Sequence, residues 1–301
     1  MKKIITALVL LLLLRHAAIG QDSALFSRLR AMSDNATNFY NVDGYQITSE
    51  HFKDAFSTGS IIKHYRRYTI REEDLQAKDD SLPMNNFCVF RTDNKAPGVT
   101  EYVSYYFVEY PDKSLTGVTF ACVNKTDRPF ERHFVQLVYD TMISKTLFTP
   151  TPTRTVNFPG QEFPFGNSCR WMGVNNLQCS PHGQMNWSIH KELTDARRNV
   201  DAQMAVNKTM KGIKVIADTV EEVVFEGQQI TAKKVTYDFT GVRSVLVAIG
   251  GGKTLTVYYV AAMVGNDAVS CVMSFWNNDH LGPDGLPGLL EEVMTPKRSG
   301  K

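Results

Sequence analysis

The spacing of hydrophobic and polar residues alternates along the chain between two periods, which predicts a mixed α+β protein. An apolar residue every three to four positions predicts helices at 22–32, 48–57, 128–143, 189–206 and 286–294. Alternating or continuously apolar runs predict strands at 61–69, 86–91, 101–110, 116–123, 213–217, 220–226, 229–239, 243–249, 254–263 and 268–276. Turn residues predict hairpins at 226–227 and 250–252. We therefore expect antiparallel sheets packed by helices.

The helix at 128–143 has the clearest boundary residues. Asp127 is placed to cap its first turn, and Pro129 suits that turn because its missing N–H has no helical partner there. Phe130, Phe134 and Leu137 share one face of this helix. We expect that face to cover a sheet.

Segment 144–168 is rich in proline and lacks periodicity, so it predicts an extended connector or a strand arm on the surface. It divides the chain into an N-terminal α+β module and a C-terminal α+β module. The full division is a leader at 1–20, modules at 21–143 and 169–296 on either side of the 144–168 connector, and a tail at 297–301.

The two modules end with the same succession of strand, turn, strand, asparagine loop and helix. A shift of 153 residues aligns Tyr105 with Tyr258, Tyr106 with Tyr259, Asn124 with Asn277, and Leu137 with Leu290. This common order predicts two similar halves. One larger sheet with coincidental symmetry is the alternative.

The C-terminal part of the chain has a hairpin within EGQQITAKKVTYDF, then the strands of KTLTVYYVAAMVGNDAVSCVMSF, then a helix. Through this order of elements, residues 213–294 resemble the α/β/α modules of the PsbP-like superfamily. The resemblance rests on element order and the place of one hairpin, and covers under a third of the chain. It implies a secreted or lumenal sandwich with a binding or assembly role, in which catalysis is often absent.

The N-terminus has the three parts of a secretory signal peptide. Lys2 and Lys3 precede an apolar run at 4–14, and small residues at 18–20 predict cleavage after Gly20. The run is shorter than the roughly 20 residues that cross a bilayer. We therefore expect a secreted or periplasmic protein without a membrane span.

Cleavage would change the formal charge from +2 to −1, because the leader contains three basic residues and no acidic ones. A nearly neutral chain without blocks of Lys or Arg gives no electrostatic footprint for nucleic acid. An oxidising compartment favours disulfides. Cys169 and Cys179 are the best pair, whereas Cys88 and Cys122 either pair across a sheet or stay as buried thiols, and Cys271 is the odd one.

Two groups of residues are candidates for ligand binding. The first surrounds the expected disulfide loop, where aromatic rings beside amides can stack on and hydrogen-bond to sugars or peptides; its members are Trp171, His182, Gln184, Asn186 and Trp187. The second is a polar cluster after the last strand and contains Trp276, Asn277, Asp279 and His280. The alternatives are core packing for the first group and a helix-entry turn for the second.

Metal and nucleotide chemistry are disfavoured by spacing. Cys169, Cys179, His182 and His190 do not have zinc-finger spacing. The glycines at 250–252 lie between expected strands, whereas a phosphate-binding loop leads into a helix. The acids of the second group do not match a calcium loop. A catalytic Cys271 with His280 and Asp279 would need an exposed thiol, but Cys271 lies in an apolar run.

We therefore expect a non-catalytic binding protein with a protein, peptide or glycan partner, and with no metal or cofactor. Two alternatives stay open. A secreted hydrolase could assemble a site from distant segments, with His182, His190, Asp279 and His280 as its members. The chain could also be a structural component of envelope assembly.

Overall fold

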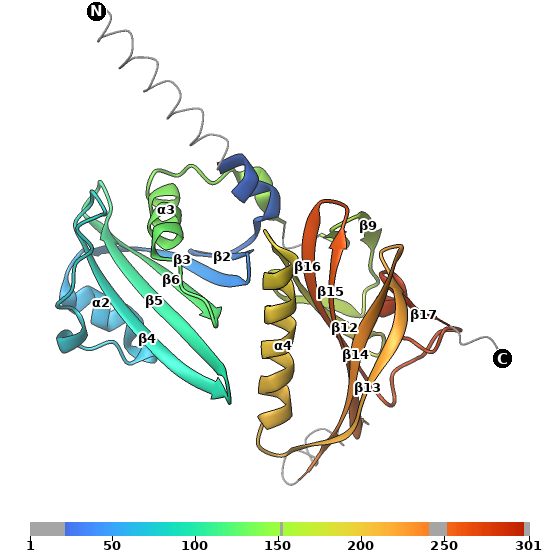
Figure 1. Cartoon of the computed structure of the whole chain (residues 1–301). Coiled ribbons are helices and arrows are strands. Elements are labelled where there is room, and N and C mark those ends of the chain that lie inside the picture. Colours follow the sequence, from blue (N-terminus) through green and yellow to red (C-terminus); the bar gives the residue numbers. More distant parts are fainter. Residues whose placement is uncertain (1–21, 151–152, 241–251, 298–301) are drawn as a thin grey trace, which may run out of the picture.

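A computed structural model describes residues 22–150, 153–240 and 252–297 (Figure 1). It confirms an α+β protein with two main sheets that are almost wholly antiparallel. The first sheet has the order β4-β5-β6-β3-β2-β1-β7. Its strands are β1 (Arg30–Asp34), β2 (Thr37–Val42), β3 (Tyr45–Ala55), β4 (Asn86–Ala96), β5 (Val99–Glu109), β6 (Ser114–Val123) and β7 (Phe148–Thr149), and only β7 pairs in parallel, with β1.

The second sheet has the order β10-β11-β12-β16-β15-β14-β13-β17. Its strands are β10 (Cys169–Gly173), β11 (Asn176–Cys179), β12 (Gly183–His190), β13 (Ile213–Phe225), β14 (Gln228–Phe239), β15 (Thr254–Val264), β16 (Asp267–Trp276) and β17 (Met294–Pro296). The expected hairpin at 226–227 joins β13 to β14 and is confirmed. The expected strand at 243–249 lies outside the described residues, as do positions 250 and 251 of the second hairpin.

Helices cover both faces of the first sheet. On one face lies α3 (Arg128–Tyr139), whose Phe134, Val135 and Leu137 join the buried cluster around Tyr40 and Phe120. The side chain of Asp127 accepts a hydrogen bond from the backbone N–H of Phe130 at 3.0 Å, which confirms the expected cap. The opposite face is covered by α2 (Thr58–Tyr65), through Ile61 and Tyr65. Short 3-10 turns follow at Arg66–Tyr68, Glu72–Asp74 and Lys145–Leu147.

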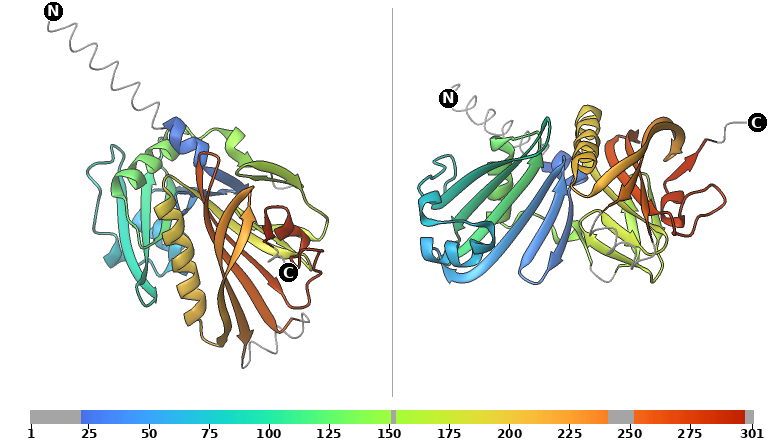
Figure 2. Two further views of the ribbon diagram at one scale, coloured as in Figure 1. Left: turned by 45° about the vertical axis from the view of Figure 1, so that its right-hand side comes forward. Right: turned by 90° about the horizontal axis from the view of Figure 1, so that it is seen from below.

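The second sheet is also covered on both faces. The helix α4 (Leu193–Thr209) buries Val200 against Val235 and Val257. The other face carries α6 (Gly288–Glu291) and a two-stranded hairpin of β8 (Thr155–Phe158) and β9 (Gln161–Pro164). This hairpin lies in the proline-rich segment, so part of that segment is a strand arm. The helix α4 also lies between the two sheets (Figure 1, Figure 2).

The expectations of a helix at 48–57 and a strand at 61–69 were both wrong, because the structure has a strand in the first segment and a helix in the second. The strand β3 covers most of the expected helix, and the helix α2 covers much of the expected strand. Ser57 caps α2 by accepting a hydrogen bond from the backbone N–H of Ser60 at 3.1 Å. The β-branched and aromatic residues of α2 suggested a strand, but they pack on the sheet with helical spacing.

Several boundaries also differ. The first helix covers 22–28 and gives way to β1, because residues 30–34 pair with β2. The helix expected from 189 begins at Leu193, since β12 continues to His190 in its pairing with β16. The helix expected at 286–294 is one turn long, and Met294 then enters β17 by pairing with Phe225. The two strands expected at 213–226 form one bulged strand, β13.

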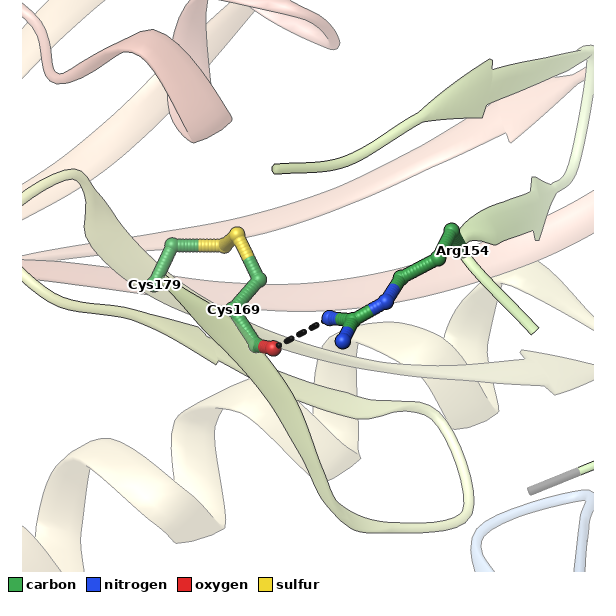
Figure 3. The surroundings of a disulfide bond; sticks show 3 residues. All are labelled: Arg154, Cys169 and Cys179. Carbon is green, nitrogen blue, oxygen red and sulfur yellow. Dashed lines mark hydrogen bonds between the residues drawn. A yellow bond between two sulfur atoms is a disulfide. The ribbon is translucent and has the colours of Figure 1, made fainter. Parts of the chain in front are cut away.

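The expected disulfide between Cys169 and Cys179 is confirmed (Figure 3). The two cysteines are register partners on β10 and β11, and the Cys169 carbonyl accepts a hydrogen bond from Arg154 at 3.2 Å. The cysteines at 88, 122 and 271 are free and buried. Cys88 and Cys122 cannot bridge in this fold, because β5 lies between their strands. No described helix is long and apolar enough to cross a membrane.

Loss of the disulfide should destabilise the protein moderately. In the chain-entropy account, a crosslink over 10 residues restricts the unfolded chain by about 2–3 kcal/mol. The Cys169→Ser/Cys179→Ser variant should therefore lose about that free energy of unfolding in urea titrations. Wild-type protein unfolded with a reductant should match it, and an equal stability of oxidised and reduced protein would contradict the expectation.

Candidate functional site

A cleft of about 500 Å³ lies between the two sheets. One wall comes from β2, β3 and β6 of the first sheet. The other comes from the β10–β11 turn, β12 and α4. The cleft therefore depends on how the two halves of the chain meet, and it lies within the volume range of small-ligand sites.

Carboxamide side chains dominate the lining of this cleft. Seven of them line it: Asn41, Gln46, Asn175, Asn176, Asn186, Asn199 and Gln203. Glu101 is the one charged residue among the described lining residues, and its carboxylate is paired with Lys95 at 2.7 Å. Phe39 adds aromatic surface, whereas Tyr40 and Trp187 are 4% and 3% exposed and pack in the cores of the two halves. Each carboxamide can both donate and accept hydrogen bonds without a net charge.

Hydrogen bonds with neighbouring side chains orient several of these amides. The Asn41 side-chain carbonyl accepts from the Ser188 hydroxyl at 2.7 Å. Gln184 donates to the Asn176 carbonyl at 3.3 Å, and Gln203 donates to that of Asn199. These hydrogen bonds therefore fix the orientation of several lining side chains.

The β2–β3 turn fastens the first sheet to the second at one end of the cleft. Asp43 N–H donates to the Ile189 carbonyl at 2.8 Å, and Gly44 N–H donates to the Ser188 hydroxyl at 3.3 Å. Gly44 has φ +80°, and a Cβ there would lie 3.2 Å from the His190 ring. A side chain would therefore be both strained and crowded at this contact.

His190 is buried at the same contact. Its Nε2 is 2.8 Å from the Ser270 hydroxyl, and burial lowers the pKa of the imidazole from 6.5 to about 4. The imidazole is therefore neutral at physiological pH, which suits a packing residue at this contact.

The structure divides the first group of expected binding residues. Asn186 and Trp187 line the cleft, and Gln184 contacts it through its bond to Asn176. Trp171 lies beside Trp187, with ring centroids 6.1 Å apart, and lines a neighbouring cavity. His182 lies elsewhere, in a cavity of about 230 Å³ next to the disulfide.

The polar groups of the second expected group close the turn after β16. Asn277 accepts from the N–H groups of Lys253 and Thr254 at 2.7 and 2.9 Å. Asp279 accepts from Trp276 N–H at 2.9 Å, and the Trp276 ring packs on Phe239 with centroids 5.1 Å apart. This geometry favours the turn interpretation over a ligand rim.

The residues of the hydrolase alternative are brought together only in part. The His182 and His280 rings lie 5.6 Å apart. His190 is at the far end of β12, about 26 Å from His182 at the usual rise per strand residue. Complete burial raises the pKa of the Cys271 thiol, which disfavours a thiolate nucleophile. The described residues contain no group of three or more metal-binding side chains.

Sequence reasoning missed most of the cleft. Gln46 and Thr48 belong to β3, part of which was expected to be helical, while Asn199 and Gln203 lie in a segment that was expected to be a helix without a functional role. A single Asn or Gln in a strand gives no functional indication by itself. Its significance here comes from the approach of two sheets.

Comparisons with known proteins give little guidance. No protein-family profile matches the chain, and no curated protein sequence matches it. Among solved structures, the di-domain ARO/CYC StfQ from the steffimycin biosynthetic pathway matches at 10% identity, with 82% of this chain and 72% of that chain covered. The TM-score is 0.15, so this similarity carries no argument about fold or function.

Proposed function

We propose that this chain is a secreted or periplasmic, non-catalytic binding protein that holds a neutral peptide or glycan in the cleft between its sheets. The observation that carries the proposal is the lining of seven carboxamides with the Phe39 ring and one charged residue. Such a surface offers donors, acceptors and stacking faces. It suits a ligand that is polar along its length and uncharged.

Export of the chain is supported by the leader at 1–20 and by the disulfide. A positively charged start, a short apolar run and small residues are the three parts of a signal peptide. A disulfide persists in an oxidising compartment. Both features favour a partner outside the cytoplasm, such as an extracellular or envelope peptide or glycan.

We further propose that the two halves arose by duplication of one PsbP-like sandwich. In the first sheet β6 pairs with β3, and in the second β16 pairs with β12. In each sheet the last long strand therefore pairs with the strand that comes third in chain order. Asn124 and Thr100 exchange two hydrogen bonds after β6, and Asn277 and Thr254 do the same after β16. In this scheme the cleft is the junction of two related modules.

Substitution of the cleft amides tests the binding proposal. Screening on glycan and capped-peptide arrays should detect a neutral ligand for wild-type protein. Gln46→Leu and Asn186→Leu should each weaken that ligand at least about tenfold, because each leaves polar ligand groups unpaired.

Gln229→Leu provides the matched control, since Gln229 is an exposed strand glutamine on β14 away from the cleft. It should bind like wild type. The proposal fails if the arrays yield no neutral ligand, or if the ligand they yield binds both cleft variants with wild-type affinity.

A further inference from the structure

A second cavity, of about 420 Å³, lies on the other side of the β10–β11 turn from the cleft. The two spaces share Val174, Asn175 and Trp187 in their walls. The second cavity is completed by β1, by residues 146–150 and by the β8–β9 arm. It therefore draws its walls from both sheets and from the connector between them.

Four buried N–H groups on residues lining this cavity have no hydrogen-bond partner among the described residues. They are Arg30 Nε, Trp171 Nε1, Asn175 Nδ2 and Trp187 Nε1. Asn175 is 6% exposed and Trp187 is 3% exposed. A buried donor without an acceptor costs about 1–3 kcal/mol, so four such donors on one cavity call for a common explanation.

These donors belong to neighbouring parts of the chain. The backbone N–H of Trp187 donates to the Asn175 carbonyl at 3.0 Å, and the rings of Trp187 and Trp171 lie 6.1 Å apart. Arg30 stands at the start of β1, and its Nη1 already donates to the carbonyls of Ser27 and Leu29. The Nε of Arg30 is the buried guanidinium nitrogen that has no partner among the described residues.

The chemistry of these groups restricts what they can bind. Indole, amide and guanidinium nitrogens donate and do not accept hydrogen bonds. Arg30 also contributes a positive charge, which burial disfavours by lowering the guanidinium pKa. Glu162 is the other charged residue that lines the cavity, and it is exposed. The negative charge of Asp267 partly offsets the effect of burial by raising the pKa of Arg30. Several donors with one cation match an oxygen-rich anion.

We propose that this cavity is a carboxylate-binding site, in which Arg30, Asn175 and the two tryptophans donate to the oxygens of a ligand carboxyl group. The site adjoins the neutral cleft, with which it shares Asn175 and Trp187, and goes beyond the function proposed for that cleft. A peptide C-terminus and an acidic sugar both present this group.

Tryptophan resonances provide a direct test. The chain has three tryptophans, two on this cavity and one, Trp276, at the end of β16. In ¹⁵N-tryptophan-labelled protein at pH 7, N-acetyl-dialanine and glucuronate serve as carboxylate probes, and the C-terminal amide of the same peptide and glucose serve as neutral probes. Trp171→Phe and Trp187→Phe assign the indole signals.

A saturable shift of the Trp171 and Trp187 indole N–H signals with at least one carboxylate probe, without movement of Trp276, is the expected result. The probe that binds more tightly identifies the source as peptide or sugar. Absence of a saturable shift with both carboxylates overturns the proposal, as do equal shifts with the neutral probes.

Asn175→Gly removes one donor and keeps the backbone relaxed, because Asn175 has φ +56° and glycine adopts that conformation readily. It should weaken the carboxylate at least about tenfold. Asn35→Gly is the matched control, since Asn35 has φ +53° in an exposed turn. Equal affinity of the two variants would overturn the assignment. Gln46→Leu should leave carboxylate binding unchanged, so this site and the neutral cleft fail or succeed separately.

Discussion

Acidification from pH 7 to pH 4 should lower the free energy of unfolding by about 3 kcal/mol through His190 alone. Burial lowers the pKa of His190 to about 4 in the folded protein, whereas the ordinary value is 6.5. Between these values the unfolded chain binds a proton that the folded chain does not. The contribution of His190 is therefore constant above about pH 6.5, is lost as the pH falls, and levels off below about pH 4.

The surroundings of His190 account for the direction of this effect. Burial is the largest cause, and the charges of Asp43 and Asp195, which favour protonation, are opposed by those of Lys125 and Arg28. The Nδ1 atom of His190 has no hydrogen-bond partner among the described residues. A protonated ring would therefore place an unpaired charge at the junction of the two sheets, which costs several kcal/mol.

Urea unfolding at intervals between pH 7 and pH 4 measures the effect. Other carboxylates titrate in this range, so the informative quantity is the difference between wild type and His190→Gln, which cannot titrate. That difference should change by about 3 kcal/mol. Ser270→Ala removes the hydrogen bond but not the burial, so it should keep the wild-type slope. Parallel profiles for wild type and His190→Gln would refute the expectation.

Gly117→Val should destabilise the protein by about 3 kcal/mol or more. Gly117 lies on β6 beneath α2, and a Cβ at this position would be 2.0 Å from the Tyr65 hydroxyl oxygen and 2.7 Å from its ring carbon Cζ. Tyr65 is 1% exposed and packs edge-on against Phe107, with centroids 4.8 Å apart. The ring is therefore closely surrounded by its neighbours.

Valine is chosen because its strand propensity and its bulk predict opposite changes in stability. Valine favours strands more than glycine does, so a loss of stability must come from overlap with Tyr65. Gly173→Val is the matched control, because a Cβ at this strand glycine meets no atom within 4 Å. In urea titrations it should be close to wild type. Tyr65→Leu in the Gly117→Val background should recover part of the loss, and a Gly117→Val protein as stable as Gly173→Val would contradict the packing argument.

Elements whose stabilising groups are close in sequence could be predicted well. The helix α3 carries its own cap in Asp127 and its own apolar face, and the two cysteines of the disulfide are 10 residues apart. The strands β4, β5, β6, β15 and β16 have apolar runs long enough to identify them. Their hydrophobic pattern is strong because both faces of each sheet are covered.

Elements whose secondary structure depends on distant partners could not be predicted from the sequence. The residues of α2 have strand propensity, and only the packing of Ile61 and Tyr65 on β4 to β6 makes their helical spacing decisive. The strands β1, β2, β10 and β11 contain many polar residues, and they are strands because neighbours supply their backbone hydrogen bonds.

The candidate sites show the same division. Sequence reasoning singled out Asn186, Trp187 and Trp171, because aromatic and amide residues gather near the disulfide. It could not supply Gln46, Asn199 or Arg30, which come from β3, α4 and β1. By itself the sequence determined an α+β chain with one short disulfide loop, and predicted its export, through patterns that act over a few residues. The tertiary structure alone decided where the polar side chains converge, because that depends on which sheet faces meet.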